Sequence, residues 1–234
     1  MKRENLVINI AGLPLDVKNR YDILQQPIYE EFICKSKKRN KRCSHFPANK
    51  HYPHFPISDG KLISYAYSQL LALNKGMLLH AAAVVKDGEV FIFFGKAGAG
   101  KSTIAGLSRK HRVLGDDIIA ARRSGAHYYA FSTPWAQAPF IRPDKNTKGK
   151  ISAVFFIKKS NRISFKLLPP EDALMRILSA HIHFLTYTGK PLAGNIFLTA
   201  ADFTRKIPAY EMEFSKNRNF WRTLEAETNA VRPQ

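Results

Sequence analysis

The chain has 234 residues with a formal net charge of +19, and 45% of its residues are hydrophobic. This composition excludes a disordered chain and supplies enough apolar residues for a folded core. The excess of 37 Lys and Arg over 18 Asp and Glu favours an anionic partner, such as a nucleotide, an acidic peptide or nucleic acid. Two cysteines are too few for a disulfide framework, and no apolar run has the roughly 20 residues of a membrane helix, so we expect a cytoplasmic protein without membrane contact.

The N-terminal residues 1–59 are predicted to form a small layer ahead of a larger domain at 60–234. Residues 5–11 and 28–34 have the apolar character of short strands. Pro14 interrupts the first apolar run, and no small-residue cleavage site follows it, so a signal peptide is not expected.

A strongly basic segment follows these strands. Residues 35–42 hold six cations among eight residues, and residues 43–59 are rich in His and Pro, which is typical of an exposed loop. Two interpretations of the basic segment stay open: it docks an acidic peptide or nucleic acid, or it is a solvated loop. Cys34 and Cys43 form no closely spaced cysteine pair, so a zinc site with the nearby histidines is not expected.

The middle of the chain is predicted to begin with a helix and a strand pair. Residues 60–75 carry apolar residues at helical spacing. Residues 81–86 and 89–94 are two apolar runs joined by Asp87-Gly88, a strong signal of a β-hairpin. The strand that enters the following glycine-rich loop is therefore expected to be half of an antiparallel hairpin, whereas the commonest folds with such a loop place that strand in a parallel βαβ unit.

Beyond the glycine-rich loop the pattern predicts a mixed α/β sheet, because helices fall between strand pairs. The predicted helices are 102–109, 170–185 and 218–227. The predicted strands are 112–115 and 207–214, together with a hairpin of 118–123 and 127–131 and a hairpin of 151–159 and 163–167.

Residues 95–103 read Gly-Lys-Ala-Gly-Ala-Gly-Lys-Ser-Thr and match the pattern G-x-x-x-x-G-K-[ST] of a phosphate-binding loop. The glycines let the backbone curl so that N–H groups of the loop and of the next helix point at phosphates. Lys101 is expected near the β and γ phosphate oxygens, the Ser102 hydroxyl on Mg²⁺, and Thr103 near the α phosphate. The predicted nucleotide-binding residues are Gly95, Ala97, Gly98, Ala99, Gly100, Lys101, Ser102 and Thr103, with ATP and Mg²⁺ as the cofactors.

Two adjacent carboxylates, Asp116 and Asp117, follow the strand predicted at 112–115. After a phosphate-binding loop, one carboxylate of such a pair can hold Mg²⁺ and the other can accept the proton of an attacking hydroxyl. His80 stands alone at a strand start, where a structural role and a catalytic role both stay open. Arg142 is a candidate cation for the transferring phosphoryl group, with surface charge as its alternative.

Four segments of the chain resemble the catalytic domain of HPr kinase/phosphorylase and its stand-alone relatives, some of which phosphorylate precursor peptides or small hydroxyl substrates. The segments are Leu79-His80-Ala81-Ala82 with the Asp-Gly hairpin, Phe94 to Thr103, Leu114-Gly115-Asp116-Asp117 and Ser132-Thr133-Pro134-Trp135. The likeness covers roughly residues 76–175.

The resemblance implies an α/β mixed-sheet P-loop fold of the phosphoenolpyruvate-carboxykinase and HPr-kinase type. It assigns His80 to the active site, Lys101 to phosphate, Ser102 to Mg²⁺ and Asp117 to the general base, which leaves Asp116 for the metal. The glycine-rich signature that follows the Asp pair in true HPr kinases has no match here, so neither HPr as substrate nor a reverse phosphorolysis is implied.

The sequence therefore predicts an ATP- and Mg²⁺-dependent kinase whose acceptor is a Ser- or Thr-type hydroxyl on a precursor peptide, a protein or a small molecule. A second hypothesis is a nucleotide-dependent regulatory module that binds nucleic acid through its basic N-terminal half. The two hypotheses differ in whether the phosphoryl group of ATP is transferred to a stable acceptor molecule. The oligomeric state is left open.

Overall fold

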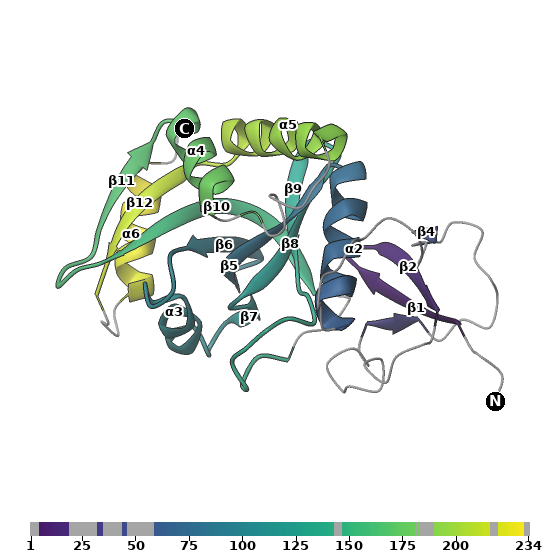
Figure 1. Cartoon of the computed structure of the whole chain (residues 1–234). Coiled ribbons are helices and arrows are strands. Elements are labelled where there is room, and N and C mark those ends of the chain that lie inside the picture. The colour runs from purple at the N-terminus through teal and green to yellow at the C-terminus, as the bar shows by residue number, and fades with distance from the viewer. Residues whose placement is uncertain are drawn as a thin grey trace.

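The computed structural model describes residues 5–18, 32–34, 44–45, 59–142, 147–180, 182, 190–215 and 220–231. A small N-terminal sheet lies beside a large mixed sheet whose two faces are covered by helices (Figure 1). The basic segment predicted at 35–42 lies outside the described residues.

The N-terminal sheet has the strand order β3-β1-β2-β4. Its strands are β1 (Asn5–Ile10), β2 (Leu13–Lys18), β3 (Ile33–Cys34) and β4 (Ser44–His45). β1 agrees with the first predicted strand, whereas β2 was not predicted because Pro14 and Asp16 interrupt its apolar pattern. Proline is tolerated here because it stands near the start of its strand, opposite Asn9 in the pairing with β1.

Helix α2 (Asp59–Leu73) joins the small sheet to the large one. Its buried Tyr67 hydroxyl donates a hydrogen bond to the Ile8 carbonyl at 2.5 Å, with the Leu13 carbonyl 3.2 Å away. Apolar side chains of β1, β2 and α2 share one buried cluster with Leu78 and Ala120 of the large sheet. The domain division between residues 59 and 60 stays a prediction.

Within the described residues, eight strands form the large sheet in the order β11-β12-β10-β6-β5-β8-β9, with β7 paired to β5. β10 also pairs with β9, so the sheet closes on itself from β10 through β6, β5, β8 and β9. The strands are β5 (Gly76–Lys86), β6 (Glu89–Phe94), β7 (Arg112–Gly115), β8 (Ile118–Ser124), β9 (His127–Phe131), β10 (Lys148–Lys159), β11 (Ser164–Leu168) and β12 (Ala209–Phe214).

The hairpin predicted at Asp87-Gly88 is confirmed. β5 and β6 pair antiparallel up to Lys86 and Glu89, and the two turn residues have φ of 51° and 80°. Two positive φ values in succession are the conformation of the tight hairpin turn that Asp-Gly favours. On its other side β6 runs parallel to β10, so the strand that leads into the glycine-rich loop is held from both sides.

The hairpin predicted from 151–159 and 163–167 is wrong, because β12 lies between β10 and β11. β12 pairs parallel with β10 and antiparallel with β11. The more apolar strand takes the inner position: Tyr210 and Met212 of β12 are buried, whereas Leu167 of the edge strand β11 is 53% exposed. Phe93, Phe155 and Tyr210 then stack across β6, β10 and β12 with ring centroids 5.3 and 5.4 Å apart.

Helices cover both faces of the large sheet (Figure 1). α4 (Pro170–Ala180) and α5 (Lys190–Lys206) pack on one face, and α3 (Lys101–Leu107) and α6 (Phe220–Val231) on the other. α4 is shorter than the predicted 170–185, since Ile182 instead bridges to Leu79 of β5. The sequence interpretation missed α5.

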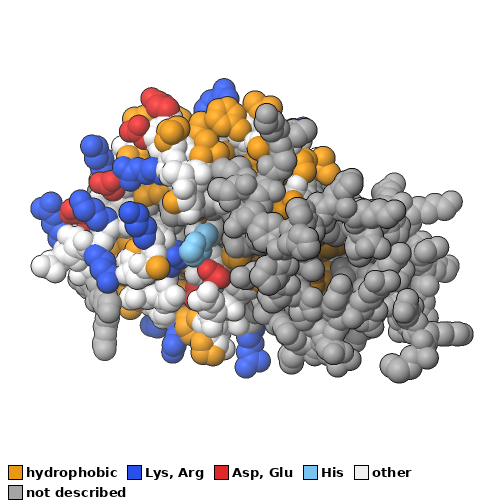
Figure 2. Space-filling view, in the orientation of Figure 1, with side chains coloured by type: hydrophobic (Ala, Val, Ile, Leu, Met, Phe, Trp, Pro, Cys, Tyr) orange, Lys and Arg blue, Asp and Glu red, His pale blue; other side chains and the backbone are white. Residues whose placement is uncertain are grey.

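The outer faces of α4 and α5 carry exposed apolar side chains, which gather at the top of Figure 2. They include Met175 at 65%, Phe197 at 48% and Leu198 at 65% exposure. Lys and Arg side chains are spread over the rest of the described face in the same view. No described helix combines the length and apolar character needed to cross a membrane.

Candidate active site

The glycine-rich loop connects the end of β6 at Phe94 to the start of α3 at Lys101. Gly100 has φ 118°, which L side chains rarely adopt, and a Cβ there would lie 3.1 Å from the Phe214 ring. A Cβ on Gly95 would lie 2.7 Å from the Cβ of Ala99. Both positions require glycine, because the loop curls back on itself between strand and helix.

Lys101 folds back over this loop. Its Nζ donates a hydrogen bond to the Gly95 carbonyl at 2.7 Å, and the Lys96 carbonyl lies 3.5 Å away. The residue is only 8% exposed, and this burial lowers the pKa of its ammonium group, while the charges of Asp117 and Asp116 act in the opposite direction. Lys101 is therefore a desolvated cation beside two carboxylates.

Asp116 is buried, and its two carboxylate oxygens have different partners. Oδ1 accepts hydrogen bonds from the backbone N–H groups of Gln137 at 2.8 Å and Ala138 at 3.3 Å. Oδ2 accepts one from the Ser102 hydroxyl at 3.2 Å. The backbone contacts hold the carboxylate so that its other oxygen faces the first turn of α3.

Asp117, the second carboxylate of the pair, contacts His80. The distance from His80 Nε2 to Asp117 Oδ1 is 3.1 Å, and the two side chains are 40% and 23% exposed. The Ala81 N–H donates to the Asp117 carbonyl at 2.9 Å, next to the pairing of His80 with Ile118 between β5 and β8. Sheet register therefore brings together two residues that are 37 positions apart in the sequence.

The segment after β9 supplies the amides that hold Asp116. Ser132 donates to the Leu114 carbonyl at 2.8 Å and Thr133 to the Ile118 carbonyl at 2.5 Å, on either side of the Asp pair. Trp135 packs edge-on against Tyr67, with ring centroids 6.4 Å apart. Sequence reasoning missed Gln137 and Ala138, which act through their backbone. Their only signal is the preceding Ser-Thr-Pro-Trp stretch.

A cavity of about 740 Å³ opens beside the glycine-rich loop. Its lining residues come from the loop, from the β10–β11 connection and from the end of β12. They are Gly98, Ala99, Gly100, Thr103, Lys159, Ser160, Asn161, Phe214 and Ser215. This volume lies within the range of roughly 300–1,000 Å³ that small-molecule and cofactor sites occupy.

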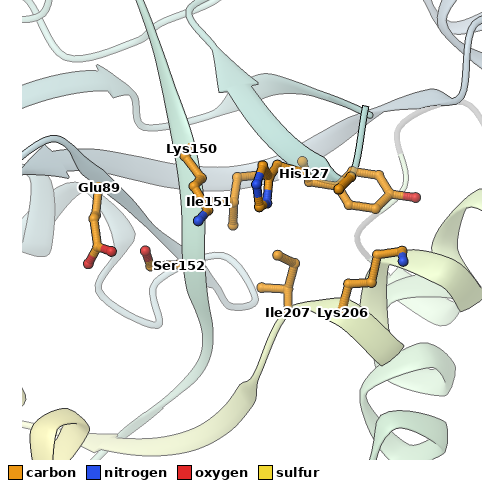
Figure 3. A pocket seen from close by; sticks show the side chains of 9 residues that line it. Glu89, His127, Lys150, Ile151, Ser152, Lys206 and Ile207 are labelled. Carbon is orange, nitrogen blue, oxygen red and sulfur yellow. The ribbon is translucent and has the colours of Figure 1, made fainter. Parts of the chain in front are cut away.

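Other hollows lie away from the loop, and two of them carry several cationic side chains. The hollow in Figure 3, about 260 Å³, is lined by Lys150, Lys206, His127 and Glu89 among others. Glu89 begins β6, so this hollow lies at the opposite end of that strand from the loop. The Glu89 carboxylate offsets the positive charge of the two lysines in the hollow. Arg142 lies in the other hollow, together with Arg109 and Arg112, and not among the residues that line the cavity beside the loop.

The structure thus gathers Lys101, Ser102, Asp116, Asp117 and His80 at the mouth of the glycine-rich loop. We call these residues, with Gly95–Thr103, the loop site. Its donors and acceptors are a buried ammonium group, a hydroxyl, two carboxylates and an imidazole. Among the described residues, no group of three or more His, Cys, Asp or Glu side chains is arranged to hold a metal ion.

The fold and site define a mixed α/β protein with a glycine-rich loop between a strand and a helix. Residues 60–229 match the family model described as SynChlorMet cassette protein ScmC, and the chain belongs to this family. No curated protein matches the chain. One similar solved structure is that of the Hpr(Ser) kinase/phosphatase from Coxiella burnetii, with 12% identity and a TM-score of 0.39 over 65% of this chain and 96% of that chain. A likeness this distant establishes neither a shared fold nor a shared activity.

Proposed function

We propose that the protein is a kinase that transfers the γ-phosphoryl group of ATP to a Ser- or Thr-type hydroxyl, with Mg²⁺ as its metal. The observation that carries this proposal is the placement of two separate carboxylates at the loop site. Asp116 contacts the Ser102 hydroxyl, and Asp117 contacts His80. Asp116 would then serve the metal and Asp117 the acceptor hydroxyl, which is the division that a transfer to a hydroxyl requires.

The residues present fit the nucleotide and the metal. The loop curls so tightly that Gly95 and Gly100 admit no side chain, and a curl of this kind would turn backbone N–H groups toward the phosphates. Lys101 would exchange its contacts with loop carbonyls for phosphate oxygens. A hydroxyl and a carboxylate are hard oxygen ligands, and Mg²⁺ in kinase sites uses one or two such groups together with substrate phosphates. When bound, Mg²⁺ neutralises charge on the β and γ phosphoryl oxygens.

Asp117 would act as the general base. The acceptor oxygen forms a bond to the γ phosphorus, the bond to the β-γ bridging oxygen breaks, and ADP leaves. The hydroxyl proton passes to a carboxylate oxygen of Asp117. His80 would hold Asp117 in place through its hydrogen bond to Oδ1, so His80 is a positioning residue in this scheme. A well-placed base of this kind contributes ~10²–10⁴-fold to the rate.

The test measures transfer from γ-labelled ATP to a library of Ser- and Thr-containing peptides, and ATP affinity by fluorescence on the same preparations. Asp117→Asn keeps the size of the side chain but cannot take the proton, so transfer should fall by about 10²–10⁴-fold with ATP binding retained. Asp87→Asn is the matched control, because it removes one exposed carboxylate at a turn where Asn tolerates the positive φ of 51°.

Transfer at the parent rate by Asp117→Asn shows that the base assignment is wrong. ATP binding by the parent without transfer to any hydroxyl favours the nucleotide-dependent regulatory module over the kinase. The acceptor class, a hydroxyl-bearing peptide, protein or small molecule, is part of the same proposal.

A further inference from the structure

A hollow of about 480 Å³ lies at the far end of α3 from the loop site. It is lined by the exposed Arg109, Arg112 and Arg142, by His111, and by the less exposed Val113, Phe140 and Ile141, which we call its apolar floor. We call it the arginine hollow. None of the described residues that line it carries a carboxylate, so the described lining combines positive charge with an apolar floor.

Two of the guanidinium groups are held in place by neighbours. The Arg109 guanidinium lies over the Phe140 ring, 4.4 Å from its centroid, and Arg112 donates a hydrogen bond to the Thr147 hydroxyl. A planar guanidinium held in this way loses less freedom when it binds a carboxylate, and it can bind both oxygens at once. The hollow is therefore prearranged for anionic groups.

One short segment joins the arginine hollow to the loop site. The Gln137 and Ala138 amides hold Asp116, and the Ile141 N–H donates to the Ala138 carbonyl at 3.0 Å in the turn that leads to Arg142. Five residue steps from Gln137 to Arg142 span at most about 18 Å, even when fully extended. A ligand in the hollow is thus within reach of a peptide whose hydroxyl lies at Asp117.

We propose that the arginine hollow binds an acidic segment of the peptide acceptor, with the carboxylates on the guanidinium groups and a neighbouring apolar side chain on the floor. This proposal rests on the proposed kinase function and names its substrate class. An extended peptide advances about 3.3 Å per residue, so the acidic residues lie within about six positions of the acceptor hydroxyl. The apolar floor favours a peptide over a nucleic acid. A peptide can place an apolar side chain directly beside its carboxylates, whereas the charged sugar-phosphate backbone offers no apolar group at that position.

The test begins with binding, which needs no ATP and no transfer. The probe is a fluorescein-labelled 12-residue peptide containing Glu-Leu-Glu, and its matched partner contains Gln-Leu-Gln. We expect the parent protein to bind the acidic peptide at least tenfold more tightly by fluorescence anisotropy. The double variant Arg109→Gln/Arg142→Gln should lose most of this preference, because only Arg112 remains, and its midpoint of thermal unfolding should be unchanged because both side chains are exposed.

The control variant Lys158→Gln/Lys166→Gln removes the same charge from exposed positions on β10 and β11 and should keep the preference. Equal binding of both peptides by the parent, or equal loss in the control variant, overturns the proposal. A single-stranded oligonucleotide that depends on Arg109 and Arg142 and displaces the acidic peptide also overturns it, in favour of nucleic acid. Failure of the kinase proposal gives a different result, since the binding preference then persists without phosphoryl transfer.

In a kinase-active preparation, the serine of the acidic peptide is moved from one to ten positions away from the glutamates. Phosphate incorporation should be highest when the separation is within about six residues. Incorporation that is independent of the separation contradicts the link between the arginine hollow and the loop site.

Discussion

The two ends of α3 show different ways of using charge. At the loop site, Lys101 and Asp116 are buried, both signs of charge are present, and each group contacts a protein partner. At the arginine hollow, the guanidinium groups are exposed and of one sign. Buried, hydrogen-bonded charges are fixed in position and suit chemistry, whereas exposed charges of one sign suit the recognition of an oppositely charged ligand.

Among the changes that compare the two ends of α3, removal of the buried Lys101 charge should have the largest effect on nucleotide binding. Lys101→Ala deletes the cation expected at the β and γ phosphates and leaves the Gly95 carbonyl without its donor, so nucleotide affinity or turnover should fall at least tenfold. Arg109→Gln removes a charge at the other end of α3 and should leave nucleotide affinity unchanged. Isothermal titration with ATP and Mg²⁺ compares the two, and equal losses would mean that both ends serve the nucleotide.

Loss of the metal-side carboxylate should have the next largest effect. Asp116→Asn keeps an oxygen that can accept from the Gln137 and Ala138 amides, so the fold should be retained. The missing negative charge should raise the half-saturating Mg²⁺ concentration by about tenfold, the effect of roughly 1.4 kcal/mol of lost charge interaction. A Mg²⁺ titration of ATP binding measures this shift, and an unchanged midpoint removes Asp116 from the metal side.

The backbone of the loop can be tested by adding one methyl group. Gly100→Ala forces φ 118° on an L residue and places its Cβ 3.1 Å from the Phe214 ring, so it should lower the free energy of unfolding by about 1–3 kcal/mol. Gly98→Ala is the matched control: its φ is 75° and no atom lies within 4 Å of the new Cβ, so the cost should be about 1–2 kcal/mol. Urea denaturation of both variants measures the difference.

The affinity of the loop site for ATP should decrease as the pH rises into the alkaline range. Burial lowers the pKa of the Lys101 ammonium below its ordinary value of 10.5, so the free protein loses this charge earlier than an exposed lysine does as the pH rises. Since the phosphates select the protonated form, ATP affinity should decrease as the pH approaches that lowered pKa. The arginine of Lys101→Arg stays protonated over this range. The ATP affinity of this variant should be equal to or weaker than that of the parent, and it should not change with pH. A flat profile for the parent protein contradicts the prediction.

The smallest expected effect is that of salt. Between 0.05 and 0.3 M NaCl, acidic peptide binding at the exposed arginine hollow should weaken severalfold, because screening acts most strongly on exposed charges. ATP binding through the buried Lys101 should weaken less over the same range. Parallel anisotropy titrations compare the two slopes, and a steeper slope for ATP would reverse the comparison between the two ends of α3.

Features that depend on neighbouring residues could be predicted from the sequence. Asp87-Gly88 predicted the β5–β6 hairpin because only certain residues adopt two successive positive φ values. The spacing of glycines, Lys101 and Ser102 predicted a curled loop ahead of a helix, and the Asp pair was expected to follow a strand. In each case the determining contacts lie within a few residues of one another along the chain.

Features that depend on pairings between distant residues emerge only in the folded chain. The insertion of β12 between β10 and β11 overturned a locally plausible hairpin, since burial of Tyr210 and Met212 depends on strands and helices elsewhere. The resemblance placed His80 in the site, but its contact with Asp117 follows from the register of β5 on β8. The Ser-Thr-Pro-Trp stretch marks the neighbourhood of the amides that hold Asp116, but neither these amides nor the arginine hollow could be assigned a role from the sequence. Backbone N–H groups and exposed arginines acquire a role only when a fold brings them to a partner.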